Sequence, residues 1–166
     1  MVDADVRQST LQRIAQRLRD ERVKLAGRWL DRVAELVTVS RLDVFPSQDL
    51  LDHIPEVIAE IAAYVEGPED GAVETNRIII ARAAELGVLR HLQHASVHQL
   101  LREYRLLAEL LETFVAREVA AMADVDGRSV AQALRRVAES VRVMQQHTID
   151  TFVANYTQTI EQQTTQ

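Results

Sequence analysis

The stretch SVAQALRRVAESVRVMQQHTIDTFVANYTQTI, residues 129–160, decides what kind of fold this chain can adopt. Neither glycine nor proline interrupts the sequence from Ser129 to Gln166, and serine is a favoured residue at a helix N-cap. About 33 helical residues span roughly 50 Å, which exceeds the width of a domain of this size. The sequence therefore predicts a long terminal helix over residues 129–166.

The apolar residues of this helix form two successive stripes. The first keeps a heptad rhythm and consists of Val130, Leu134, Val137, Val141, Met144 and Thr148. The second is rotated around the helix and consists of Ile149, Phe152, Val153, Tyr156 and Ile160. Heptad spacing is typical of helices that pair along a seam.

One stripe can pack on the chain's own core, which leaves the other for a second copy. We therefore expect a dimer and signalling surface formed by Met144, Thr148 and the rotated stripe, in a helix that continues into further sequence. The alternative is a long last helix that lies along its own domain.

The remainder of the chain also has helical periodicity, so we expect an all-α fold in one domain, residues 1–166. An apolar stripe runs from Leu11 to Leu36, where Gly27 either separates two helices or is tolerated within one. Pro55 predicts a second helix start inside residues 48–65, with Asp52 as its cap. Another helix is expected from about Val73 to about Leu89.

Composition excludes several classes of protein. A net charge of −6 argues against a nucleic-acid-binding surface, and the absence of cysteine excludes disulfides and thiolate chemistry. The longest strongly apolar run, residues 78–81, is far too short to cross a membrane. Together with the absence of cysteine, this favours a cytoplasmic protein. No catalytic constellation is visible, so we expect that it is not an enzyme.

Three of the five histidines, His91, His94 and His98, lie within eight positions. On one continuous helix they would share a face, as metal ligands do. Ser96 and Gln99, however, form a capping-box pattern that starts a new helix at Val97. We therefore interpret the three as polar turn and surface residues, and expect no metal or cofactor. A metal site and a haem ligand are the alternatives.

The helix that follows is apolar on more than one side. Its expected core stripe includes Leu100, Leu101, Tyr104, Leu107 and Leu111. Glu103 is unusual because apolar residues share its side, and an unpaired buried charge is costly. We expect a rim residue that reaches solvent, with an ion pair across a subunit interface as the alternative.

Three segments carry a family resemblance. They are RWLDRV (28–33), LLDHIPEVIAEI (50–61) and SVHQLLREYRLLAELL (96–111). Together they resemble the N-terminal domain of RsbT co-antagonist (RsbR-type) proteins, which is also found at the N-terminus of bacterial sensor histidine kinases. The most specific part contains Leu100, Leu101, Arg102, Glu103 and Tyr104.

The resemblance implies a globin-like helical bundle without haem, which dimerises. Its last helices would lead to an output module, either a histidine kinase core or a stressosome-type scaffold domain. Leu86 stands where the family commonly has a histidine, so no ligand site is transferred. Because the implied fold is globin-like, a haem-binding sensor is the alternative function. In that case a histidine near a helix end would be the iron ligand.

Overall fold

The longest element of the computed structural model is α6 (Gly127–Thr164), which confirms the predicted terminal helix. The structure describes residues 2–39, 48–68, 72–73 and 76–165, and these residues form helices and no strands. The other helices are α1 (Val2–Asp20), α2 (Arg22–Val39), α3 (Gln48–Val65), α4 (Arg77–Leu92) and α5 (Val97–Ala120). None of the described helices is long and apolar enough to cross a membrane.

The N-cap of α6 lies three residues earlier than the sequence predicts, since it is Asp126 and not Ser129. The Asp126 carboxylate accepts hydrogen bonds from the backbone N–H of Ser129 (3.1 Å) and from its hydroxyl (2.7 Å). These bonds satisfy groups that a helix N-terminus otherwise leaves unpaired. The hydroxyl bond is the main reason that the pKa of Asp126 lies below its usual value.

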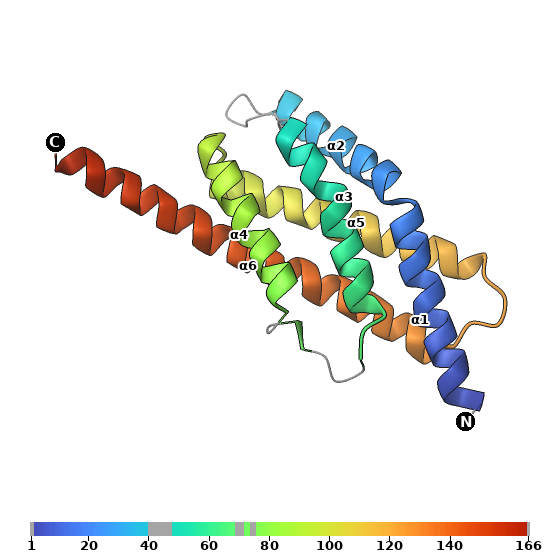
Figure 1. Cartoon of the computed structure of the whole chain (residues 1–166). Helices are drawn as coiled ribbons and strands as arrows, with labels where there is room; N and C mark the ends of the chain where they lie inside the picture. The colour runs from blue at the N-terminus through green and yellow to red at the C-terminus, as the bar shows by residue number, and fades with distance from the viewer. Residues whose placement is uncertain (1, 40–47, 69–71, 74–75, 166) are drawn as a thin grey trace.

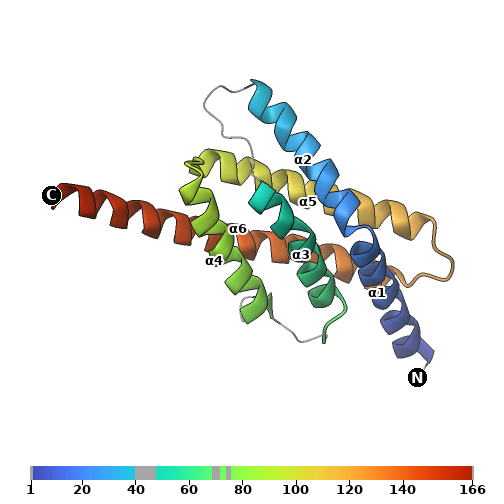
Figure 2. The same ribbon diagram turned by 45° about the horizontal axis from the view of Figure 1, so that its top comes forward.

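α6 is the common support of the bundle, since α1, α3, α4 and α5 all pack against it. Figures 1 and 2 show that its C-terminal end nonetheless projects past the other helices. At 1.5 Å per residue its 38 residues span about 57 Å. From Val153 to Thr165 every residue except Asn155 is exposed.

The N-terminal stripe divides at Glu21, between α1 and α2, where the apolar pattern has its gap. Gly27 lies inside α2 and faces open space. Gly27 therefore does not separate two helices but is accommodated within one.

The predicted second start at Pro55 is wrong, since α3 runs through Pro55 from Gln48 to Val65. A proline inside a helix removes one backbone hydrogen bond. In α3 the apolar face continues on both sides of it, with Ile54, Val57 and Ile58 fully buried. Packing of this face outweighs the local cost of the proline.

The C-terminus of α3 is held by a side chain of α6. Arg136 is buried and donates hydrogen bonds to the carbonyls of Tyr64, Val65 and Gly67 at 2.8–3.1 Å, and to Pro68 at 2.6 Å. Carbonyls at a helix end lack partners within the helix and carry partial negative charge. One guanidinium therefore caps α3 and fixes it to α6.

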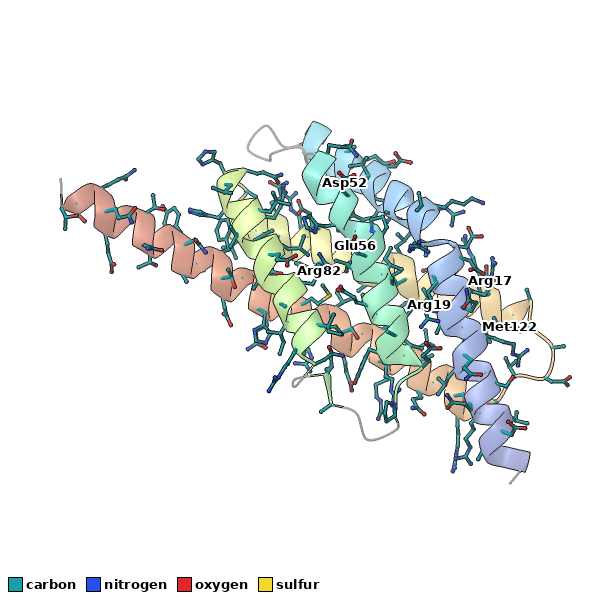
Figure 3. The ribbon with its side chains drawn as sticks, viewed as in Figure 1. Arg17, Arg19, Asp52, Glu56, Arg82 and Met122 are labelled. Carbon is teal, nitrogen blue, oxygen red and sulfur yellow. The ribbon has the colours of Figure 1, made fainter. Side chains whose placement is uncertain are left out.

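Ion pairs join the remaining helices. Arg82 of α4 reaches Glu56 (2.8 Å) and Glu60 (3.0 Å) of α3, and Figure 3 shows Arg82 and Glu56 on these neighbouring helices. Arg17 of α1 reaches Glu118 of α5 at 2.9 Å. Because these pairs are partly solvated, they orient the helices more than they stabilise the fold.

Candidate functional site

The site is built on the first turns of α5, where the sequence places the family motif. Ser96 is the N-cap, and its hydroxyl oxygen accepts the backbone N–H of Gln99 at 3.0 Å. This confirms the predicted helix start. The Gln99 side chain donates to the Glu103 carboxylate at 2.9 Å, in the protein interior.

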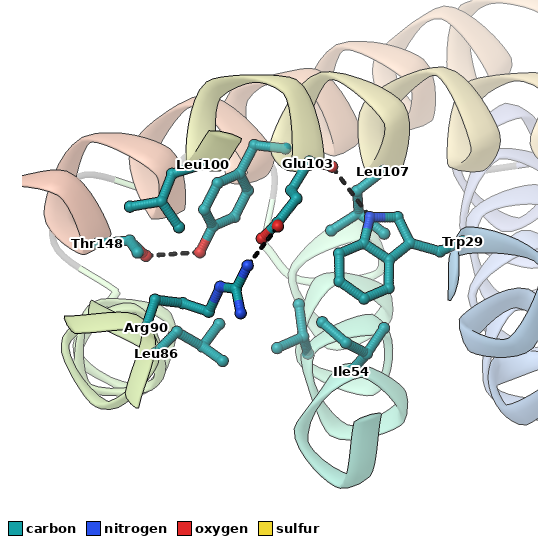
Figure 4. Close-up of a pocket in the computed structure, with 10 residues that line it drawn as sticks. Trp29, Ile54, Leu86, Arg90, Leu100, Glu103, Leu107 and Thr148 are labelled. Atoms are coloured by element: carbon teal, nitrogen blue, oxygen red, sulfur yellow. Dashed lines mark hydrogen bonds and ion pairs between the residues drawn. The ribbon is translucent and has the colours of Figure 1, made fainter. Parts of the chain in front are cut away.

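Glu103 is 5 % exposed, so the expectation of a solvent-reaching rim residue is wrong. Its carboxylate pairs with the guanidinium of Arg90, which is 1 % exposed, at 2.5 Å (Figure 4). Arg90 lies in the last turn of α4, so this ion pair joins α4 to α5 within one chain. Each charge compensates the other in an environment where either alone would be costly.

A chain of hydrogen bonds continues from α5 to α6. The Thr148 hydroxyl donates to the Ala83 carbonyl of α4 at 3.0 Å, so it accepts from the Tyr104 hydroxyl at 2.5 Å (Figure 4). Burial raises the pKa of Tyr104, which keeps its hydroxyl protonated as a donor. These contacts connect α4, α5 and α6 at one level of the bundle.

α2 joins the same cluster through its tryptophan. The indole N–H of Trp29 donates to the backbone carbonyl of Glu103 at 3.0 Å. We refer to Trp29, Arg90, Gln99, Glu103, Tyr104 and Thr148 as the buried polar cluster. It brings together side chains of four helices, α2, α4, α5 and α6.

The rest of the motif is less uniformly buried than predicted. Leu100 is 1 % exposed, whereas Leu101 is 40 % exposed and does not belong to the core stripe. Arg102 is half-buried. Leu101 lies about 100° around the helix from Leu100, which turns it away from the core.

The three neighbouring histidines do not converge. His91 lies in α4, His94 adopts a positive φ of 60° in the turn, and His98 lies in the first turn of α5. No three His, Cys, Asp or Glu side chains gather as a metal site in the described ranges. None of the three lines the small cavity beside the cluster, whose volume of about 20 Å³ is far below that of a porphyrin.

His91 has a packing role instead. Its ring meets the Phe152 ring edge-on, with centroids 5.6 Å apart, and its Nε2 lies 3.3 Å from the Thr159 hydroxyl. Gly87, one turn earlier, allows α4 to approach the backbone of α6 closely. α4 and α6 therefore run side by side from residue 148 to residue 159 of α6.

The predicted dimer residues separate into two groups. Met144, Thr148 and Phe152 are buried within the protomer, and Ile149 is half-buried. Val153, Tyr156 and Ile160 are 46 %, 55 % and 44 % exposed in the C-terminal part of α6, where the Tyr156 ring also meets the His91 ring edge-on at a centroid distance of 6.4 Å. We call these three residues the exposed stripe.

Sequence reasoning missed Arg90 as the partner of Glu103, although a signal was present. Ile79, Ala83, Leu86 and Arg90 are spaced four, three and four residues apart, which places the arginine on the buried face of α4. Two opposite charges on apolar faces of consecutive helices were the indication of a pair.

A family model described as the RsbT co-antagonist protein rsbRD N-terminal domain matches residues 23–166. The match covers α2 to α6, and with them the whole buried polar cluster and the exposed stripe. No curated protein and no solved structure matches the chain.

Proposed function

The chain belongs to the RsbT co-antagonist protein rsbRD N-terminal domain family, and we propose that it is a non-enzymatic, cytoplasmic sensor domain that dimerises through α6. The bundle is of globin-like type, and α6 passes a signal to an output module. That module is a stressosome-type scaffold domain or a histidine kinase core.

The observation that carries this proposal is the exposed stripe. Val153, Tyr156 and Ile160 repeat at intervals of three and four residues on an exposed face of α6, whose C-terminal end projects past the other helices (Figure 1). Apolar side chains at this spacing gain free energy when a second helix covers them. A second copy of the same helix presents a matching stripe around a twofold axis.

The proposal also requires a link between the core of the bundle and α6. The buried polar cluster reaches α6 at Thr148, five residues before the exposed stripe begins. A change in how α4 and α5 pack at this level would therefore rotate or shift the projecting end. Signalling of this kind needs two packings that are close in free energy.

Because the chain contains no cysteine, single cysteine substitutions report on proximity without background. We expect Tyr156→Cys to form a disulfide-linked dimer under mild oxidation. Ala154→Cys is the matched control, since Ala154 is also exposed but lies about 160° around the helix from Tyr156. Equal cross-linking at both positions, or none at Tyr156→Cys, would argue against pairing through the exposed stripe.

A further inference from the structure

A groove lies at the surface between α2 and α5, two neighbouring helices that pack against each other (Figure 2). Its volume is about 600 Å³. Arg28 and Arg32 line it from α2, while Thr113 and Arg117 line it from α5. None of its lining residues belongs to the buried polar cluster or to the exposed stripe, so the groove is a separate feature of the molecule.

The three arginines of this groove differ from most other arginines of the chain because they lack a partner. Elsewhere the guanidinium groups reach carbonyls or carboxylates, as Arg13 does at the end of α5 and Arg82 does on α3. Arg28, Arg32 and Arg117 are exposed, and none of them has a hydrogen bond or ion pair among the residues that the structure describes. Their donors are therefore available to a binding partner.

Two acidic residues also line the groove, but they do not balance the arginines. Glu109 is already paired with Arg105 of its own helix at 3.2 Å. That leaves the single carboxylate of Asp31 beside three guanidinium groups. The groove thus has a local positive excess in a chain whose net charge is −6. Guanidinium groups bind carboxylates particularly well, because they can donate two parallel hydrogen bonds.

Apolar side chains lie among these charges. Leu110 is half-buried, Phe114 is 8 % exposed, and both line the groove. Covering this apolar surface is favourable for a ligand that brings an apolar group of its own. A nucleic-acid backbone offers negative charge without apolar side chains. A protein segment offers carboxylates and apolar side chains in one chain, which matches both features of the groove.

We propose that the groove between α2 and α5 is a docking site for an acidic amphipathic segment of a partner protein. Carboxylates of the segment pair with Arg28, Arg32 and Arg117, and an apolar side chain between them packs against Leu110 and Phe114. This site goes beyond the proposed function, since it involves no residue of α6. It gives the domain a contact with another protein in addition to the dimer.

The two sides of the groove are connected without the partner. Trp29, which follows Arg28 in α2, donates its indole N–H to the backbone carbonyl of Glu103 in α5 at 3.0 Å. The arginines of α2 are therefore carried by a helix that is already fixed to α5. Such preorganisation lowers the entropy that binding costs.

A fluorescein-labelled peptide of about fifteen residues, with leucine at every fourth position and mostly glutamate between, is a suitable probe for the full chain. We expect saturable binding by fluorescence anisotropy, which weakens as the salt concentration rises. Arg28→Gln/Arg32→Gln should weaken binding about fivefold to tenfold, as expected for the loss of two exposed charge contacts. Arg117→Gln should also weaken it, because α5 supplies the other side of the groove.

The matched control is Arg77→Gln/Arg128→Gln. Arg77 and Arg128 are also exposed and without a partner among the described residues, but they do not line this groove. The two double variants have the same net charge, so they separate a local effect from a general one. We expect the control to bind the peptide as wild type does.

Four results would overturn the proposal. The first is equal weakening by the two double variants, which would reduce the effect to net charge. The second is unchanged binding in Arg28→Gln/Arg32→Gln. The third is equally tight binding of a peptide in which glutamine replaces every leucine, since the apolar surface would then have no part. The fourth is tighter binding of single-stranded DNA of similar length, which would make the occupant a nucleic acid.

Discussion

At the residue scale, the ion pair with Arg90 explains how the carboxylate of Glu103 can lie on an apolar side of its helix. The two side chains are 1 % and 6 % exposed, so neither is screened by water. A buried ion pair contributes little net stability compared with well-packed apolar residues, but removal of one partner is costly. Its role here is to fix which face of α4 meets α5.

This role predicts the behaviour of single and double variants. Glu103→Ala leaves the Arg90 charge uncompensated and should lower the free energy of unfolding by about 3–5 kcal/mol. The double variant Arg90→Met/Glu103→Leu should recover most of that loss. Urea unfolding followed by circular dichroism measures both. A double variant as unstable as Glu103→Ala would show that charge compensation is not the cause.

Asp126 gives a prediction about pH. Its pKa is lowered in the folded state, chiefly by the Ser129 hydroxyl, from a usual value of 3.8. The stabilising effect of its charge is therefore fully present above about pH 4–5 and is lost as the pH falls through the lowered folded pKa. Asp126→Asn keeps a capping acceptor but removes the charge.

We expect wild type to be more stable than Asp126→Asn at pH 7, with a difference that shrinks between pH 5 and pH 2 as the carboxylate is protonated. Urea midpoints of both proteins across this range test the point. A difference that does not change with pH would mean that the charge has no part in capping α6.

Several residue roles could be predicted from the sequence because they depend on neighbours in the chain. Ser96 as an N-cap is one, since the Ser96–Gln99 spacing is itself the signal. The partner of Glu103 lies 13 residues away on another helix. Its identity depends on how α4 and α5 cross, which local periodicity does not specify.

At the element scale, Gly87 determines how closely α4 can approach α6. A Cβ added at Gly87 would lie 2.6 Å from the Thr148 carbonyl oxygen and 2.8 Å from the Thr151 Cβ. Both distances are shorter than atoms can tolerate, and one involves backbone. Only glycine lets the two helices pack at this distance.

Two glycine substitutions should therefore have opposite effects. Gly87→Ala should destabilise by about 1–3 kcal/mol, because α4 must move away from α6. Gly27→Ala should stabilise by up to about 1 kcal/mol, since Gly27 is helical and faces open space. Thermal unfolding of both variants beside wild type is the measurement, and destabilisation of equal size in the two would contradict this account of the α4–α6 contact.

Local sequence patterns predict some of the helices correctly but not all of their boundaries. The long α6 was predictable because nothing in its sequence interrupts a helix. Pro55 was misread because its local cost was visible in the sequence, whereas the burial of Ile54 and Ile58 that offsets it is tertiary. Ser129 was predicted as the cap of α6, whereas the structure has Asp126 in that position. Both are good capping residues, so intrinsic preference alone does not separate them.

At the scale of the whole molecule, a bundle of helices supports one longer helix that extends beyond it (Figure 2). The all-α class follows from sequence periodicity, whereas the division of the α6 residues between core and surface does not. Phe152 and Val153 are adjacent in sequence, yet one is 7 % exposed beside His91 and the other 46 % exposed. Only the position of α4 decides which is covered.

This division predicts that neighbouring substitutions act on different properties. Phe152→Glu should lower the stability of the protomer by about 3–5 kcal/mol, as burial of an unpaired charge in place of an aromatic ring is costly. Val153→Glu and Tyr156→Glu should leave the unfolding midpoint of the protomer nearly unchanged and weaken its association. Denaturation at a concentration where wild type is monomeric separates the effect on protomer stability from the effect on association. Equal destabilisation by all three substitutions would contradict the division of α6 into buried and exposed residues.

The central claim is that the exposed stripe of α6 is covered by a second copy of the chain. Light scattering at tens of micromolar measures this most directly, since one protomer has a mass of 18.8 kDa. We predict twice that mass for wild type and the single protomer mass for the Val153→Glu/Tyr156→Glu double variant. A protomer mass for wild type, or a dimer that the double variant leaves intact, would contradict the account.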